Sequence, residues 1–148
     1  MEKGVRDAQK RYQEISDIVE GDETGEKFVS GLVRSVNRYV GSVSEMQAFF
    51  RSNSSDSRSQ GNGYEAEKYQ ERVKELDNLR RSSHEGLISR LHMVNRYLFN
   101  QYPEETPRGG IYSLSPNSIT DRKAIGEWAG YLYKAISTTN KPSEQKNE

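Results

Sequence analysis

Five polar residues with the chemistry to hold a ligand fall at or beside the apolar positions of helical patterns. They are Arg80, His84, Asn37, Asn95 and Arg96. Arginine offers five fixed N–H donors, histidine can donate and accept, and asparagine does both. Together they could form a hydrogen-bonded network or a pocket for an anion. The simpler interpretation is that Arg80 and His84 lie at a partly exposed helix edge, so a structural role stays open.

Two near-identical pentapeptides carry three of these residues. Val-Asn-Arg-Tyr-Val occupies 36–40 and Val-Asn-Arg-Tyr-Leu occupies 94–98. Each lies in a long stretch of apolar residues at helical spacing, which predicts two long helices that place Asn37 and Asn95 beside the core. Buried polar groups are retained only when they find partners. This neighbourhood is therefore the candidate ligand-binding site.

The sequence offers no motif for catalysis, a metal or a cofactor. It has no cysteine, and His84 and His92 are eight residues apart, whereas two ligands on one helical turn need a spacing of three or four. Glu85 and Glu127 complete no HExxH or Glu-x-x-His pattern, and no serine has a Gly-x-Ser-x-Gly setting. We therefore expect no catalytic residue, no metal and no cofactor, and we favour a non-enzymatic role.

The length and the charge balance of the chain limit the classes of protein to which it can belong. The 148 residues amount to about one domain, with 22 basic residues, 22 acidic residues and nine tyrosines. This balance argues against a strongly basic nucleic-acid binder and against an enzyme for acidic substrates. The first twenty residues lack the apolar core of a signal peptide, and no stretch approaches transmembrane length. We expect a cytoplasmic protein without membrane contact.

Apolar periodicity predicts four helices. They cover roughly residues 3–20, 24–51, 64–101 and 120–138. The predicted fold is all-α, an up-and-down bundle of about four helices with a long third helix. The predicted domain spans 1–138, with a flexible loop at 52–63 and a disordered tail at 139–148.

Several residues mark the expected helix ends. Gly21 is placed to end the first helix and Thr24 to cap the second, while Ser118 or Thr120 can cap the last. Ser82 and Glu85 have the spacing of a capping box, which leaves a third helix split there as an alternative. The unbroken apolar register favours one continuous or kinked helix.

Glycines mark two further features. Gly31 and Gly41, inside the second helix, are compatible with the close approach of another helix or with chance. Gly109 and Gly110 lack the Lys-Ser ending of a phosphate-binding loop, so they predict a turn. The short apolar segment 111–114 that follows is expected to lie extended on the bundle.

Three motifs stand in the second half of the chain: Arg80-x3-His84-x2-Leu87-Ile88-x2-Leu91-x3-Asn95-Arg96, Gly110-Ile111-Tyr112, and Asp121-Arg122-x2-Ile125-x2-Trp128-Ala129. In these motifs the chain resembles a family of small uncharacterised bacterial helical proteins, chiefly from Gram-positive organisms. The resemblance covers about residues 75–135. It implies a compact helical domain and no mechanism.

The leading hypothesis for function is a protein-interaction or regulatory domain with a small-ligand pocket near the polar cluster. Its expected partner is a second copy, giving a homodimer, or another protein. Aromatic residues at helical spacing usually fill a core or an interface. Bundles with few apolar residues often complete their core by pairing.

The alternative is an RNA-processing or nucleic-acid-binding bundle. The chain loosely resembles the helical bundles of the HEPN family, although Arg80 and His84 are closer together than in that family's Arg-x4–6-His motif. A contiguous basic stripe would favour nucleic acid, and scattered, neutralised charges would oppose it. The residues of such a stripe would be Arg34, Arg38, Arg90 and Arg96. A small-molecule hydrolase, the third hypothesis, lacks its metal and nucleophile motifs.

Overall fold

The structure is a computed structural model that describes residues 2–52 and 63–139. Its α-helices are α1 (Lys3–Ile18), α2 (Glu23–Ser52), α4 (Gly63–Gln101) and α5 (Arg122–Thr139), with a short 3-10 helix, η1, at Pro116–Ser118. No strand occurs in these two ranges. The predicted all-α fold of four helices, with a long third one (α4), is confirmed.

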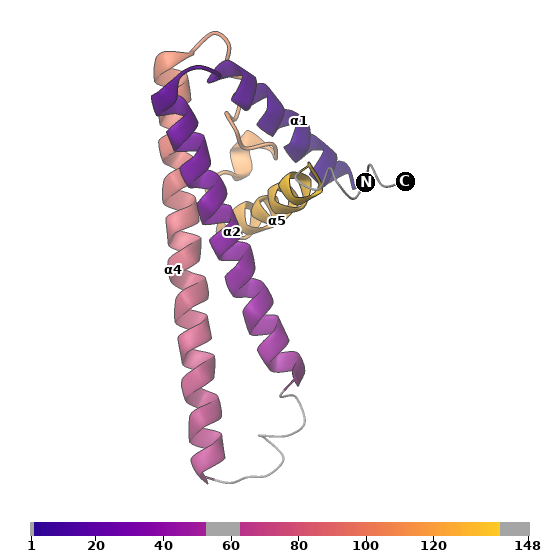
Figure 1. Cartoon of the computed structure of the whole chain (residues 1–148), viewed down its shortest axis with the longest axis vertical. Helices are drawn as coiled ribbons and strands as arrows, with labels where there is room; N and C mark the ends of the chain where they lie inside the picture. The colour runs from indigo at the N-terminus through magenta and orange to yellow at the C-terminus, as the bar shows by residue number, and fades with distance from the viewer. Residues whose placement is uncertain (1, 53–62, 140–148) are drawn as a thin grey trace.

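A long helical hairpin forms the frame of the molecule. The helices α2 and α4 run side by side in opposite directions (Figure 1). With its 39 residues, α4 is about 58 Å long. Both α1 and α5 lie at one half of this hairpin, and the hairpin extends beyond α5 at the end of α2 and the beginning of α4 (Figure 1), in segments that include residues 42–52 and 66–80. We call these two segments the arm.

The core lies where α1 and α5 meet the hairpin. Trp128 of α5 is fully buried, and its ring centre is 5.5 Å from that of the buried Tyr112 in the α4–α5 connection. Ile15 of α1, Leu32 of α2 and Leu91 of α4 are also fully buried. One apolar core therefore joins all four helices and the connection.

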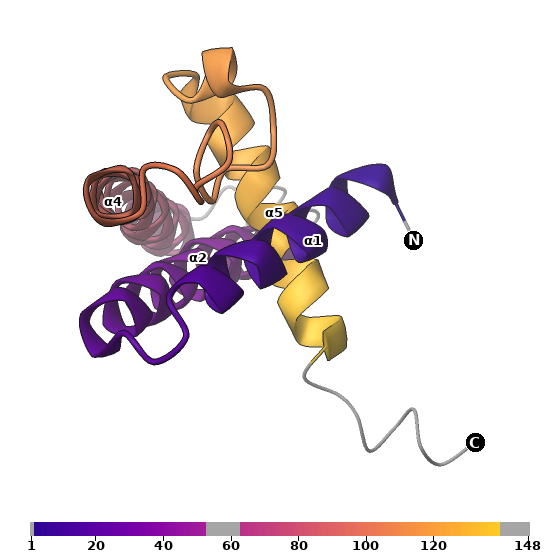
Figure 2. The same cartoon turned by 90° about the horizontal axis from the view of Figure 1, so that it is seen from above.

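The last helix crosses the hairpin. Figure 2 looks along the hairpin and shows α5 lying across α2, which it contacts. At the crossing, a Cβ atom on Gly126 would lie 2.8 Å from the hydroxyl oxygen of Tyr39. Glycine lets the two helices approach this closely. The four-helix bundle is thus closed by a crossing helix.

The turn between α1 and α2 is built by Gly21 and Asp22. Gly21 has a φ of +86°, the left-handed conformation expected of a residue that follows a helix. The Asp22 carboxylate accepts the backbone N–H of Gly25 at 3.1 Å and so caps α2. The assignment of Thr24 as the cap is wrong, because α2 begins at Glu23 and Thr24 already lies in its first turn.

The cap of α5 also differs from the expected residues: it lies one position after Thr120 and three after Ser118. Asp121 accepts the N–H of Lys123 at 3.0 Å, whereas Ser118 lies in η1 and Thr120 precedes the cap. Ser118, Thr120 and Asp121 can all serve as N-caps, so the sequence pattern does not separate them. The expectation of Ser118 or Thr120 is therefore corrected to Asp121.

The third helix is continuous through Ser82. The Ser82 hydroxyl donates back to the carbonyl of Leu79 at 3.2 Å, as serine does inside a helix. Glu85 forms an ion pair with Arg122 of α5 instead of completing a cap. The continuous helix is confirmed, and the split alternative is wrong.

The predicted flexible loop and disordered tail lie, apart from their end residues, outside the described residues. The division into a domain at 1–138 and a tail at 139–148 stays a prediction. Within the described ranges, no helix combines the length and the apolar composition that crossing a membrane requires.

Candidate functional site

Arg80 and His84 of the predicted polar cluster have partners within the chain. Arg80 Nη2 donates to Asp77 Oδ1 at 2.9 Å, one turn earlier on α4. The His84 ring stacks on Tyr39 of α2 with ring centres 4.9 Å apart. His84 Nε2 lies 3.0 Å from the carbonyl oxygen of Arg122, at the start of α5. His84 therefore joins three helices.

The electrostatic setting of His84 favours the neutral ring. Partial burial lowers the pKa of His84, and the charges of Arg122 and Arg80 act in the same direction. A neutral ring with its hydrogen on Nε2 can donate to the Arg122 carbonyl. An RNA-cleaving pair would need Arg80 and His84 to face one open space, whereas here each faces a partner in its own chain.

The other three predicted residues lie in different surroundings. Asn37 and Arg96 are exposed, and Asn95 is only 8% exposed. A five-residue motif spans more than one helical turn, so its side chains point to different sides and depend on what packs around each helix. The structure does not gather the five residues of the predicted cluster into one site.

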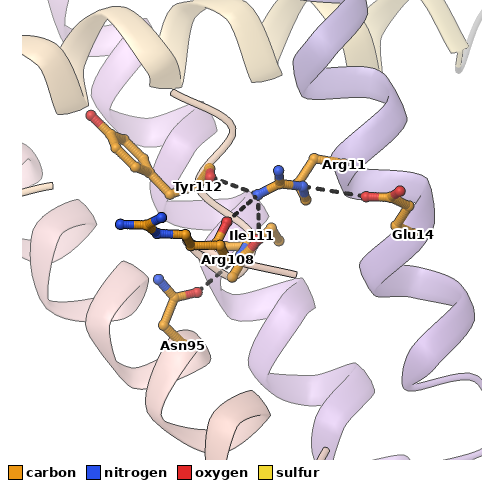
Figure 3. A network of polar contacts seen from close by, with 7 residues as sticks. Arg11, Glu14, Asn95, Arg108, Ile111 and Tyr112 are labelled. Atoms are coloured by element: carbon orange, nitrogen blue, oxygen red, sulfur yellow. Dashed lines mark hydrogen bonds and ion pairs between the residues drawn. The ribbon is translucent and has the colours of Figure 1, made fainter. Parts of the chain in front are cut away.

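Asn95 fastens the loop at 108–112 to α4 (Figure 3). Its side-chain nitrogen donates to the Gly109 carbonyl at 3.1 Å, and its side-chain oxygen accepts the N–H of Ile111 at 3.0 Å. Gly110 has a φ of +63°, and a Cβ atom there would collide with the Asn95 amide. The predicted turn at Gly109 and Gly110 is confirmed, and glycine is needed for this contact.

Arg11 of α1 holds the same loop from the opposite side (Figure 3). Its Nη1 donates to the carbonyls of Gly110 and Tyr112, both at 2.8 Å, and at 3.3 Å to that of Arg108. Glu14, one turn later on α1, lies 3.3 Å from Arg11 Nε and helps to orient the guanidinium. We call Arg11 and Asn95 the loop clamp. The sequence contains no local sign of the Arg11 contacts, because the loop is about a hundred residues away.

Asp22 is a second polar centre that the sequence patterns do not reveal. Besides capping α2, it accepts hydrogen bonds from the hydroxyl groups of Tyr97 at 2.5 Å and Tyr102 at 2.7 Å. These donors, Tyr97 first, lower the pKa of Asp22, and the carboxylate raises the pKa of Tyr97 to about 12. The Gly21-Asp22 pair in the sequence can indicate the cap of α2, but no neighbouring residue indicates the contacts of Asp22 with the two tyrosines.

Two adjoining hollows between α2 and α4 collect basic side chains. The first, of about 610 Å³, is lined by Thr24, Lys27, Phe28, Ser30, Arg34 and Arg90. The second, of about 440 Å³, is lined by Gly31, Arg34, Ser35, Asn37, Arg38 and Arg90. Because Arg34 and Arg90 line both, we treat the two hollows as one feature, the arginine groove. Of the five predicted residues, Asn37 is the one that lines it.

No part of the described structure shows the arrangement of a metal centre. Within residues 2–52 and 63–139, no three His, Cys, Asp or Glu side chains gather closely enough to hold a metal ion. The side chains that line the arginine groove instead offer hydrogen-bond donors and positive charge.

The fold and these contacts define a small all-α domain built on a long helical hairpin. The family described as "Protein of unknown function (DUF3232)" matches residues 1–141, and the chain belongs to this family. No curated protein matches the chain. The predicted membership of an uncharacterised helical family is confirmed, and the match extends well beyond residues 75–135.

The loop clamp can be tested through stability. Arg11→Ala should lower the free energy of unfolding by about 2–3 kcal/mol, because three backbone carbonyls lose a charged donor. Lys10→Ala is the matched control, since Lys10 is exposed, and should change stability by less than about 0.5 kcal/mol. Urea unfolding followed by circular dichroism measures both. Equal effects of the two substitutions would contradict the clamp.

The Asp22 contacts predict a pH dependence. Asp22→Asn keeps an oxygen to cap α2 but removes the charge that the tyrosine hydroxyls bind. Hydrogen bonds from Tyr97 and Tyr102 lower the pKa of Asp22 below 3.8 in the folded chain. The charged form therefore stabilises the fold above that pH, and its contribution is lost as the pH falls through the folded-state pKa.

We expect Asp22→Asn to be less stable than the wild type at neutral pH. The difference should shrink as the pH is lowered from 3.8 through the folded-state pKa. Urea titrations of both proteins across the acid range measure this difference. A difference that stays constant with pH would show that the charge of Asp22 does not contribute.

Proposed function

We propose that the chain is a non-enzymatic interaction domain that pairs with a second copy of itself through the arm. The observation that carries this proposal is the thin packing of residues 42–52 and 66–80. In these segments only Ser42 and Leu76 are buried. Phe50 and Leu79 remain 39% and 37% exposed. Where only α2 and α4 pack together, the apolar face that the two helices share is exposed to water on one side. We call this face the seam.

The seam continues along the arm with side chains of intermediate burial. They are Val43, Met46, Phe49, Tyr69 and Val73. Phe49 contacts both neighbouring aromatic rings, with centres 5.8 Å from Phe50 and 5.2 Å from Tyr69. A second hairpin laid against this seam would complete a four-helix bundle, the usual way in which such a seam is covered.

The charges of the arm support a second copy as the partner. The five acidic residues of the arm are matched by five basic ones: Glu45, Glu67, Glu71, Glu75 and Asp77 against Arg51, Lys68, Arg72, Lys74 and Arg80. Arg72 of α4 already joins the two helices by an ion pair with Glu45 of α2, and it also pairs with Glu75 on its own helix. Two near-neutral arms do not repel one another, and a twofold axis makes a mixed surface self-complementary.

A cytoplasmic location and a bacterial origin are part of this proposal. Their support is the resemblance, described above, to a family of small bacterial helical proteins. A different protein that occupies the same seam would be the competing outcome, and it predicts a chain that is monomeric on its own.

Self-association can be tested with two matched phenylalanines. Phe50 lies in the arm, and Phe99, which is 43% exposed, lies near the other end of α4. Phe50→Ser should weaken dimerisation at least about tenfold, because each copy loses apolar area from the interface. Phe99→Ser should leave dimerisation unchanged. Sedimentation equilibrium over a range of protein concentrations measures both dissociation constants.

Two results would contradict self-association through the arm. The first is a wild-type chain that stays monomeric at the highest concentration at which it is soluble. The second is an equal loss of dimerisation in Phe50→Ser and Phe99→Ser, since that would place the interface elsewhere or make it non-specific.

A further inference from the structure

The side chains of Arg34 from α2 and Arg90 from α4 both approach Gly31 of α2. A Cβ atom at Gly31 would lie 3.1 Å from Nη1 of Arg90 and 3.8 Å from Nη2 of Arg34. The two nitrogens are therefore no farther apart than the sum of these distances, about 7 Å. Because Gly31 has no side chain, the guanidinium of Arg90 can lie against the backbone of α2. Of the two glycines noted in this helix, Gly31 marks a close approach, whereas a Cβ atom added at Gly41 would meet no other part of the described structure within 4 Å.

Within the described ranges the three arginines of this groove have no carboxylate partner, whereas Lys27, which lines its first hollow, lies 3.8 Å from Glu23. None of Arg34, Arg38 and Arg90 forms an ion pair in the described ranges, although basic side chains elsewhere on the hairpin, such as Arg72 and Arg80, do. Like charges at this separation repel each other. An anion placed between the two guanidinium groups would turn the repulsion into two attractive contacts.

The separation of the two guanidinium groups fits an oxyanion. Two N–H···O bonds of about 2.8 Å, with roughly 2.5 Å between two oxygens of one phosphate, span about 8 Å when extended. Arg34 and Arg90 can therefore each donate to a different oxygen of the same group. The guanidinium fork matches phosphate geometry better than a point charge does. Arg38 and Asn37 line the same hollow and offer further donors.

We infer that the arginine groove binds the phosphate group of a nucleotide. The adjoining hollow favours a nucleotide over a bare phosphate, because Phe28 supplies an aromatic wall for a base and the hydroxyls of Thr24 and Ser30 can bind a sugar. The hollows, of about 610 and 440 Å³, have the size of small-molecule sites. The nucleotide is either free or part of a single strand of nucleic acid, since both present this chemistry.

This inference is independent of self-association. The groove uses α2 from Thr24 to Arg38, whereas the arm begins at Ser42. Three of the four arginines of the possible basic stripe, Arg34, Arg38 and Arg90, line the groove, and Arg96 does not.

Binding to the full chain tests the site. The probes are inorganic phosphate and the four ribonucleoside monophosphates, each measured by isothermal titration calorimetry, and a fluorescein-labelled single-stranded RNA, measured by polarisation. Arg34→Ala combined with Arg90→Ala should weaken binding at least about tenfold, because two charged donors are lost. Arg90→Lys keeps the charge without the fork and should weaken binding less. Arg96→Ala is the matched control on the same helix and should bind like the wild type.

The probes separate the two sources of the phosphate. Binding of a monophosphate that the double variant loses supports a free-nucleotide site, and binding of RNA alone supports a nucleic-acid strand. Circular dichroism checks that the variants fold, as expected for exposed side chains. The inference is overturned if no probe binds, if Arg96→Ala weakens binding as much as the double variant, or if inorganic phosphate binds as tightly as the best nucleotide.

Discussion

The loop at 108–112 is held between Arg11 of α1 and Asn95 of α4, and the arrangement of the other elements depends on this clamp. The loop carries Ile111 and Tyr112 into the core, where their backbone polar groups cannot reach water. Such groups need partners inside the protein. The Asn95 side-chain oxygen accepts the N–H of Ile111 at 3.0 Å, and the Arg11 guanidinium donates to the Tyr112 carbonyl at 2.8 Å. The Tyr112 N–H donates to the Gly109 carbonyl at 3.1 Å. Once the loop is fixed, Tyr112 contacts Trp128 and positions α5 across the hairpin.

This closure gives the hairpin two different ends. At one end α1, α5 and the clamped loop cover the apolar seam, and Asp22 ties the α1–α2 turn to Tyr97 and Tyr102 near the end of α4. At the other end the same two helices continue, and no other described helix packs on them there (Figure 1). The two proposed binding surfaces differ in chemistry: the arm presents exposed apolar side chains, and the arginine groove presents positive charge.

The helices could be predicted from the sequence because their signal is local. Apolar spacing predicts the four helices, and the unbroken register through Ser82 predicts a continuous α4. The two glycines at 109 and 110 predict the turn. The observed caps differ from the expected ones because aspartate, serine and threonine all serve as N-caps, and apolar spacing defines the first residue of a helix only to within one or two positions.

The polar contacts could not be predicted, because they join residues far apart in the sequence. Asp22 is 75 residues from Tyr97, and Arg11 is 99 residues from Gly110. The repeated Val-Asn-Arg-Tyr motif shows the same limit: Asn37 is exposed while Asn95 is buried in the clamp. Identical local sequence gives different contacts when the surrounding helices differ. The five residues of the predicted cluster therefore lie in different surroundings. The arginine groove could not be predicted, because it requires Arg34 of α2 and Arg90 of α4 to lie side by side.

The central claim is that the clamped end of the hairpin is structural, while the arm and the groove bind. Hydrogen exchange followed by mass spectrometry on the full chain tests this division directly, because segments with few buried contacts exchange fastest. Raising the protein concentration should slow exchange at 42–52 and 66–80, and adding nucleotide should slow it at 24–38, with no change at 108–112. Changes confined to 108–112, or none in either binding segment, would contradict the account.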